Sequence, residues 1–156
     1  MAQKILVAMD DSENAFRAVE HVARLFTPDN EITLFSVILD TAMLCDMNSP
    51  ELIPYFVAQQ GTFCSLEEKK RDLLNTALQK AKDLLLEAGF DENKIAIKVE
   101  GQQKGVARDI VDMAHTGFDL IVLGRRGLSG IKEFFLGSVS QKVFQAVKDV
   151  SILIVN

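Results

Sequence analysis

Side chains that bind transition metals are scarce in this sequence. Its 156 residues include two cysteines and two histidines. Cys45 and Cys64 do not form a CxxC pair and have no paired histidines nearby, while His21 and His115 lie far apart inside predicted helices. This pattern argues against a zinc site, and we expect two reduced, half-buried thiols rather than a disulfide.

Long apolar runs and a basic surface are also missing. Asp40 interrupts the longest apolar run before it reaches membrane-spanning length, and the apolar run near the amino terminus is too short for a signal peptide. The net charge of −5 argues against a general nucleic-acid binder. These absences favour a cytoplasmic protein that binds neither membranes nor nucleic acids.

The remaining composition is that of an ordinary globular domain. Hydrophobic residues make up 48% of the chain and charged residues 25%, which is enough apolar material for a proper core. No internal repeat, low-complexity tract or linker divides the sequence. We therefore expect a single domain over residues 1–156.

Short apolar runs alternate with amphipathic patterns along the chain. The runs are rich in β-branched residues and predict buried strands at 5–9, 32–39, 95–99, 120–124 and 152–155. The amphipathic patterns predict helices at 13–27, 66–88, 104–116 and about 138–148. Because each crossover between parallel strands is right-handed and covers one face, this alternation predicts an open α/β domain with helices on both faces.

Local signals mark several helix ends. Ser65 and Ser138 each precede a Glu or Gln by three residues, which is the capping-box spacing and is typical of N-caps. The Ser138 hydroxyl could cap its helix or turn to a phosphate, but it could hardly do both fully. Gly89 predicts the end of the long helix.

An insertion at about residues 40–64 separates the second strand from the long helix. It is longer than a structureless connection usually is. The pair Ser49-Pro50 predicts one short helix inside it. We interpret this insertion as a flap over part of the sheet in preference to a substrate lid, and a docking surface for a protein partner stays open as an alternative.

Two polar motifs follow the first and fourth strands. They are AMDDS at 8–12 and GRRGLSG at 124–130. If the strand order is 3-2-1-4-5, both motifs reach the crevice where the strand order reverses. The Asp10 carboxylate suits ribose hydroxyls, and glycines let backbone amides approach phosphate oxygens. Gly137 and Ser138 then open the last helix, whose amino-terminal dipole favours an anion, so the pattern predicts a nucleotide site.

Other phosphate sites are not supported. The sequence has no GxxxxGK[ST] motif and no GxGxxG motif, so neither a P-loop NTPase nor a dinucleotide dehydrogenase is supported. The acidic pair Asp10–Asp11 is also typical of magnesium-binding receiver domains. A receiver site needs an Asp at the end of the third strand and a Lys after a later strand, and this sequence has neither residue at the required position. We therefore favour the nucleotide site over a receiver site. For Asp11 and Ser12 we favour a role in capping the first helix.

The glycine spacing Gly124-x2-Gly127-x9-Gly137-Ser138 resembles the G-2x-G-9x-G-[ST] motif of the ATP-binding branch of universal stress proteins. The stretches KILVAMDDSENAFRAVEHV and GVARDIVDMAHTGFDLIVLGRRG are similar to that family's first strand and helix and to its segment leading into the glycine loop. The resemblance covers the whole chain. It implies an adenine nucleotide alpha hydrolase-like sheet of order 3-2-1-4-5, ATP, ADP or AMP in the crevice, and a homodimer through the strand at Ile152 to Val155.

The resemblance also implies a set of nucleotide-binding residues. Asp10 would bond the ribose, and the adenine and sugar would be lined by Ala8, Val37 and Leu123. The phosphates would be surrounded by Gly124, Arg126, Gly127, Gly137, Ser138 and Val139. Arg125 stands where the family often has a small polar residue, and KDVSILIVN lacks the Pro-Val step common before the last strand.

Three functions follow from these features. We favour an adenine-nucleotide-binding regulatory protein of the stress response with little or very slow hydrolysis, because Asp10, Asp11 and Glu133 have no context that specifies a general base. No catalytic residue and no metal ligand is assigned. The alternatives are a Mg²⁺-dependent ATPase or autophosphorylating switch, with Ser138 or Ser140 as phosphoacceptor, and a nucleotide-free dimeric adaptor.

Overall fold

The computed structural model describes residues 2–39, 45, 54–125 and 136–156. Its strands are β1 (Lys4–Ala8), β2 (Glu31–Ile38), β3 (Ile95–Gly101), β4 (Leu120–Gly124) and β5 (Ser151–Val155). They form one parallel sheet in the order β3-β2-β1-β4-β5, which confirms the expected order.

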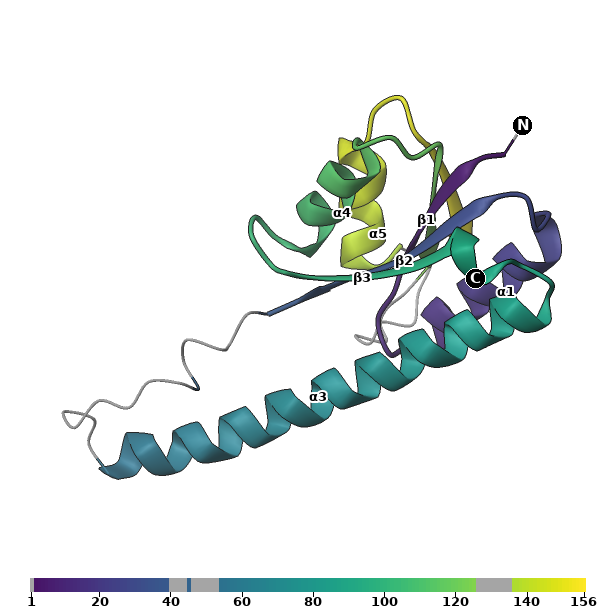
Figure 1. Ribbon diagram of the computed structural model, residues 1–156. Helices are drawn as coiled ribbons and strands as arrows, with labels where there is room; N and C mark the ends of the chain where they lie inside the picture. Colours follow the sequence, from purple (N-terminus) through teal and green to yellow (C-terminus); the bar gives the residue numbers. More distant parts are fainter. Residues whose placement is uncertain (1, 40–44, 46–53, 126–135) are drawn as a thin grey trace.

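Helices cover both faces of this sheet, as the alternation predicted (Figure 1). Helices α1 (Glu13–Leu25) and α3 (Pro54–Glu87) pack on one face, and α4 (Val106–Ala114) and α5 (Ser138–Ala146) on the other. A short 3₁₀ turn (Glu92–Lys94) precedes β3. Side chains of β1 alternate between the two cores, with Ile5 and Val7 facing α1 and α3 and Leu6 facing α4 and α5.

Helix α1 begins where the sequence places its cap. The Oγ of Ser12 accepts a hydrogen bond from the backbone N–H of Ala15 at 3.2 Å, which satisfies one of the free amides of the first turn. Its buried residues recur at helical spacing and are Ala15, Ala18, Val19 and Val22. The N-terminal turn of α1 is therefore fixed directly after β1.

Helix α3 begins at Pro54, so the predicted start at residue 66 and the predicted cap at Ser65 are wrong. Proline is compatible with a first helical turn, and Gly61 in the interior costs only about 1 kcal/mol, so nothing in residues 54–65 stops the helix. The predicted end is confirmed, because Gly89 has a φ of 98° and the Phe90 N–H bonds the Leu85 carbonyl at 3.1 Å.

The two ends of α3 have different surroundings. Its C-terminal part is buried against the sheet through Leu74, Leu78, Ala81 and Leu85, whereas its N-terminal part projects past α1 (Figure 1). The short helix expected at Ser49-Pro50 lies outside the described residues. The part of the insertion from residue 54 onward belongs to α3.

Cys45 and Cys64 form a disulfide, so the prediction of reduced thiols is wrong. Their Cα atoms lie 5.8 Å apart, within the usual range for such a bond. The extension of α3 explains the error, because the predicted helix left Cys64 in a loop, whereas Cys64 lies on α3 close to Cys45. In the part of the chain that the structure describes, no helix is long and apolar enough to cross a membrane.

Candidate functional site

The candidate site lies at the carboxyl ends of β1 and β4. From β1 the chain moves outward to β2 and β3 and then returns to β4 on the other side of β1. The connections after β1 and β4 therefore diverge to opposite faces of the sheet and leave a crevice between them.

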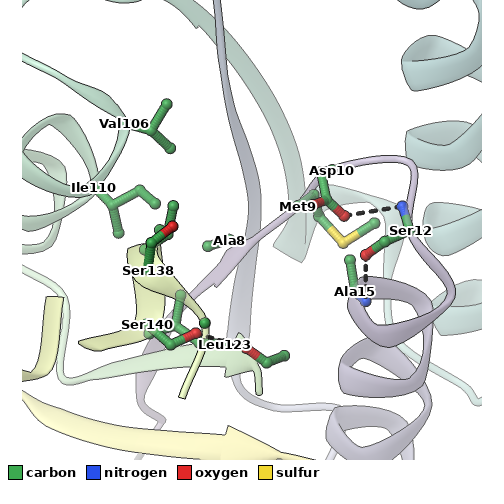
Figure 2. A pocket seen from close by; sticks show the side chains of 13 residues that line it. Ala8, Met9, Asp10, Ser12, Ala15, Val106, Ile110, Leu123, Ser138 and Ser140 are labelled. Atoms are coloured by element: carbon green, nitrogen blue, oxygen red, sulfur yellow. Dashed lines mark hydrogen bonds between the residues drawn. The ribbon is translucent and has the colours of Figure 1, made fainter. Parts of the chain in front are cut away.

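A cavity of about 300 Å³ occupies this crevice (Figure 2). Asp10 and Ser12 lie on one side of Ala8, and Ser138, Val106 and Ile110 lie on the other. The residues that line the cavity are Ala8, Met9, Asp10, Ser12, Ala15, Val106, Ile110, Leu123, Gly124, Gly137, Ser138, Val139 and Ser140.

The loop after β1 holds Asp10 in a fixed position. One carboxylate oxygen of Asp10 accepts a hydrogen bond from the Ser12 N–H at 2.9 Å, and Ser12 in turn caps α1 (Figure 2). The other Asp10 oxygen has no protein partner in the described part of the chain. It remains available to accept a hydrogen bond from a ligand hydroxyl, while Asp11 does not line the cavity.

On the opposite side, the N-terminus of α5 is anchored to the end of β4. The Gly137 N–H donates to the Arg125 carbonyl at 2.8 Å, and the Ser140 hydroxyl donates to the Gly124 carbonyl at 2.8 Å. Ser140 is buried, with 4% of its surface exposed. Its hydroxyl is thus a structural donor, which argues against the alternative that Ser140 accepts a phosphoryl group.

Ser138 does not cap α5, so this part of the sequence prediction is wrong. The N-cap is Gly137, which has no side chain to bond the first-turn amides, and no described side chain takes its place. The Ser138 side chain is exposed, lines the cavity and has no protein partner in the described ranges. The hydroxyl and the free amides of this turn are consequently available to an anion, which the helix dipole favours.

Gly124 has a packing role that its place in the glycine motif did not reveal. A Cβ at this position would lie 3.0 Å from the carbonyl oxygen of Asn14 and 3.1 Å from its carbonyl carbon. The first turn of α1 therefore packs directly on the end of β4. Any larger residue at 124 would push α1 away from the cavity wall.

Of the ten residues expected to bind nucleotide, those that line the cavity are Ala8, Asp10, Leu123, Gly124, Gly137, Ser138 and Val139. Val37 is not among the lining residues and packs against the core under α4 and α5. Arg126 and Gly127 lie outside the described residues. The Arg125 guanidinium donates to the Asn156 side chain at 3.1 Å, away from the cavity.

Helix α4 supplies an apolar wall that sequence reasoning missed. Val106 and Ile110 are one turn apart and both line the cavity. Their spacing at i and i+4 on the helix after the third strand was a usable signal, because that helix also starts at the carboxyl edge of the sheet.

Asp109 fixes the turn that leads into α4. Its carboxylate accepts hydrogen bonds from the Gln103 N–H at 2.8 Å and the Lys104 N–H at 3.0 Å. The bond from the Gln103 amide is the main cause that holds the pKa of Asp109 below its usual value. Burial acts in the opposite direction as the second cause, and the Lys104 and Gly105 amides lower the pKa further. This carboxylate therefore positions the start of the apolar wall.

The cavity joins a carboxylate, an uncapped helix N-terminus and an apolar wall. Such a site suits a ligand with hydroxyls, an anionic group and a flat apolar part. Within the described ranges, no three His, Cys, Asp or Glu side chains are grouped closely enough to hold a metal ion.

Comparisons with known proteins agree with this fold. Universal stress protein MJ0577 of Methanocaldococcus jannaschii is 27% identical over 148 residues, which cover 93% of this chain and 90% of that protein. The structure of MJ0577 matches with a TM-score of 0.73 at 25% identity, covering 99% of this chain and 96% of the other. Universal stress protein YxiE of Bacillus subtilis is 32% identical over 146 residues, or 93% of each chain.

A universal stress protein solved in complex with cAMP has the same fold, with a TM-score of 0.60 at 21% identity and coverage of 99% and 97% of the two chains. The model of the universal stress protein family matches residues 1–156. The chain therefore belongs to the universal stress protein family.

Proposed function

We propose that this stress-response protein binds an adenine nucleotide, with ATP as the first candidate, in the cavity between β1 and β4. The observation that carries the proposal is the placement of Asp10 opposite the uncapped N-terminus of α5, with an apolar wall beside them. A nucleotide has a matching part for each feature.

The parts of the ligand are assigned by chemistry. The free oxygen of Asp10 accepts a hydrogen bond from the ribose, and the phosphates lie at Ser138 and Val139, where backbone amides and the helix dipole favour negative charge. The adenine packs against Val106 and Ile110. We further propose that Arg126 and Gly127 complete the phosphate site.

The glycine motif supports this assignment, since Gly124 and Gly137 both line the cavity at the expected spacing. The relative solved with cAMP is consistent with an adenine nucleotide, but at 21% identity that likeness concerns the fold. The choice of ligand therefore rests on the cavity of this chain.

The role we propose is regulatory. Phosphoryl transfer needs a positioned nucleophile or water and usually a metal ion near the phosphates. Asp10 is engaged with the Ser12 amide, and Ser140 is buried. We therefore propose that bound ATP is hydrolysed very slowly, and that any Mg²⁺ in the site is held chiefly by the phosphates.

We propose in addition that two chains form a homodimer through β5. This strand is the last in the sheet order, so among the described strands none neighbours its outer backbone groups. Its residues Ile152, Leu153 and Ile154 are only half-buried. We also propose that the protein is located in the cytoplasm and that the 40–64 insertion contacts a protein partner.

The test is isothermal titration calorimetry with ATP, comparing the native chain with Ser138→Glu. A carboxylate in the first turn of α5 is compatible with the helix dipole, so the helix should persist, but it would repel phosphate at the cavity. We expect ATP affinity to fall at least about tenfold, equivalent to about 1.4 kcal/mol. Ser65→Glu, at an exposed position on α3, adds the same charge elsewhere and should leave the affinity unchanged.

Two results would contradict the proposal. One is a native chain that binds no ATP with or without Mg²⁺, and the other is equal ATP affinity in both glutamate variants. Nucleotide released from the freshly purified protein should be intact ATP if hydrolysis is slow, whereas ADP alone would indicate a genuine ATPase.

A further inference from the structure

A second cavity lies next to the candidate site, between α4 and α5. It has a volume of about 640 Å³, and we call it the α4–α5 groove. Its lining residues are Gln102, Lys104, Gly105, Val106, Ala107, Arg108, Ser138, Val139, Lys142, Gln145 and Ala146. Val106, Ser138 and Val139 also line the candidate nucleotide cavity, so the two cavities share a wall at the N-terminus of α5.

The charge of this groove differs from that of the whole chain. Three cationic side chains line it, Lys104, Arg108 and Lys142, and no carboxylate does, although the chain carries a net charge of −5. Arg108 lies on α4, Lys142 on α5 and Lys104 in the turn before α4. They therefore concentrate positive charge in one place.

Two of these cations are available to a ligand. Arg108 and Lys142 have no hydrogen-bond or ion-pair partner among the residues that the structure describes. Lys104 contacts Asp112 at 2.9 Å, but both side chains are more than half exposed, so this ion pair is weak and exchangeable.

The other residues that line the groove are uncharged. Gln102, Gln145 and Ser138 contribute side-chain donors, and apolar side chains come from Val106, Ala107, Val139 and Ala146. Gly105, the N-cap of α4, has no side chain that could bond the first-turn amides. The Asp109 carboxylate already accepts the Gln103 and Lys104 amides at this end of α4, so the positive charge of the groove comes from its three cations.

We propose that the α4–α5 groove binds phosphate groups in addition to those at the nucleotide cavity. The shared wall at Ser138 and Val139 allows one ligand to occupy both cavities, so the ligand class is a nucleotide with an extended anionic part, such as a dinucleoside polyphosphate. A separate phosphorylated small molecule would use the same chemistry. In its bridging form this inference rests on the proposed nucleotide function.

The experiment compares three probes by calorimetry: ATP, diadenosine tetraphosphate and inorganic tripolyphosphate, the last with and without saturating ATP. The test variant is Arg108→Gln with Lys142→Gln, which removes the two unpaired cations. The matched control is Lys69→Gln with Lys148→Gln, two exposed lysines that line neither cavity. All four substitutions are at exposed positions, and thermal unfolding checks that both variants fold.

A bridging ligand predicts that diadenosine tetraphosphate binds the native chain about tenfold more tightly than ATP, because its additional phosphates reach the two unpaired cations, Arg108 and Lys142. The test variant should lose this gain while its ATP affinity changes less than about twofold. A separate ligand predicts that tripolyphosphate binds beside ATP and that the test variant loses this binding. The control variant should match the native chain in both cases.

Identical affinities of native chain and test variant for all three probes would overturn the proposal. Failure of the nucleotide function gives a different result, because tripolyphosphate is also tested without ATP. Suppose that ATP does not bind, that tripolyphosphate binds the native chain, and that the test variant loses tripolyphosphate binding. This result would support the phosphate site in the groove and contradict the proposed nucleotide function.

Discussion

At the scale of single residues, Gly124 joins the glycine motif to the packing of α1. The carbonyl of Asn14 leaves no space for a Cβ at this position. We expect Gly124→Ala to destabilise the chain by about 1–3 kcal/mol, the usual cost of overpacking, and to weaken ATP binding by moving α1. Urea denaturation measures the first effect and calorimetry the second.

Gly61 provides the control for this variant. A Cβ there meets nothing within 4 Å, and the residue lies inside α3, so Gly61→Ala should stabilise the chain by about 0.5–1 kcal/mol. If the Gly124→Ala variant and the native chain are equally stable, α1 can shift to make room for the Cβ without loss of stability, which would contradict the prediction.

A second prediction at this scale concerns Asp109 and pH. The folded state lowers the pKa of Asp109 below 3.8, because the ionised carboxylate accepts the Gln103 and Lys104 amides. Its contribution to stability is therefore complete above the pKa of the unfolded chain and is lost as the pH falls through the lower folded value. Asp109→Asn should have a lower urea midpoint than the native chain at pH 7, and the difference should shrink below pH 3.8.

Asp72 is a suitable comparison, since it is exposed on α3 and its side chain accepts no hydrogen bond from described residues. Asp72→Asn should change the urea midpoint little at either pH. If the urea midpoints of the native chain and Asp109→Asn differ as much at pH 2 as at pH 7, the negative charge of Asp109 does not contribute to stability.

At the scale of elements, the disulfide connects α3 to Cys45 through Cys64 on the helix. The bond closes a loop between residues 19 positions apart and fixes the projecting part of the helix to the preceding chain. By the usual loop-closure relation, Cys45→Ser with Cys64→Ser should lower the free energy of unfolding by about 3 kcal/mol. ATP affinity should not change, because neither cysteine lines the cavity.

Thiol titration tests the bond itself. Under non-reducing conditions neither cysteine should react in the unfolded chain, and both should react after reduction. Two reactive thiols per chain before reduction would mean that the original expectation of free cysteines was correct for the protein in solution.

At the scale of the whole molecule, we expect the two edge strands of the sheet to differ in their role in dimer formation. We expect Ile154→Lys on β5 to convert a dimer into a monomer, since a charge would be buried in the proposed interface. Ile97→Lys on β3 is the control, because Ile97 is also on an edge strand and is 38% exposed. Light scattering of native chain and variants measures the mass, and a monomeric native chain would contradict the dimer.

Features that depend on residues close together in the chain could be predicted from the sequence. The positions of the strands, the cap at Ser12 and the end of α3 at Gly89 follow from hydrophobic period and turn chemistry, which act within a few residues. The glycine spacing and Asp10 also located the candidate site, because parallel strands bring their carboxyl ends to one edge.

Features that depend on contacts between distant parts of the chain became known from the fold alone. The disulfide, the place of Val37 in the core and the contact of Gly124 with Asn14 each require knowing which elements pack together. The same holds for the wall from α4 and for the charge of the α4–α5 groove. Local patterns specify elements, but the distance between side chains on different elements is set by how the helices pack on the sheet.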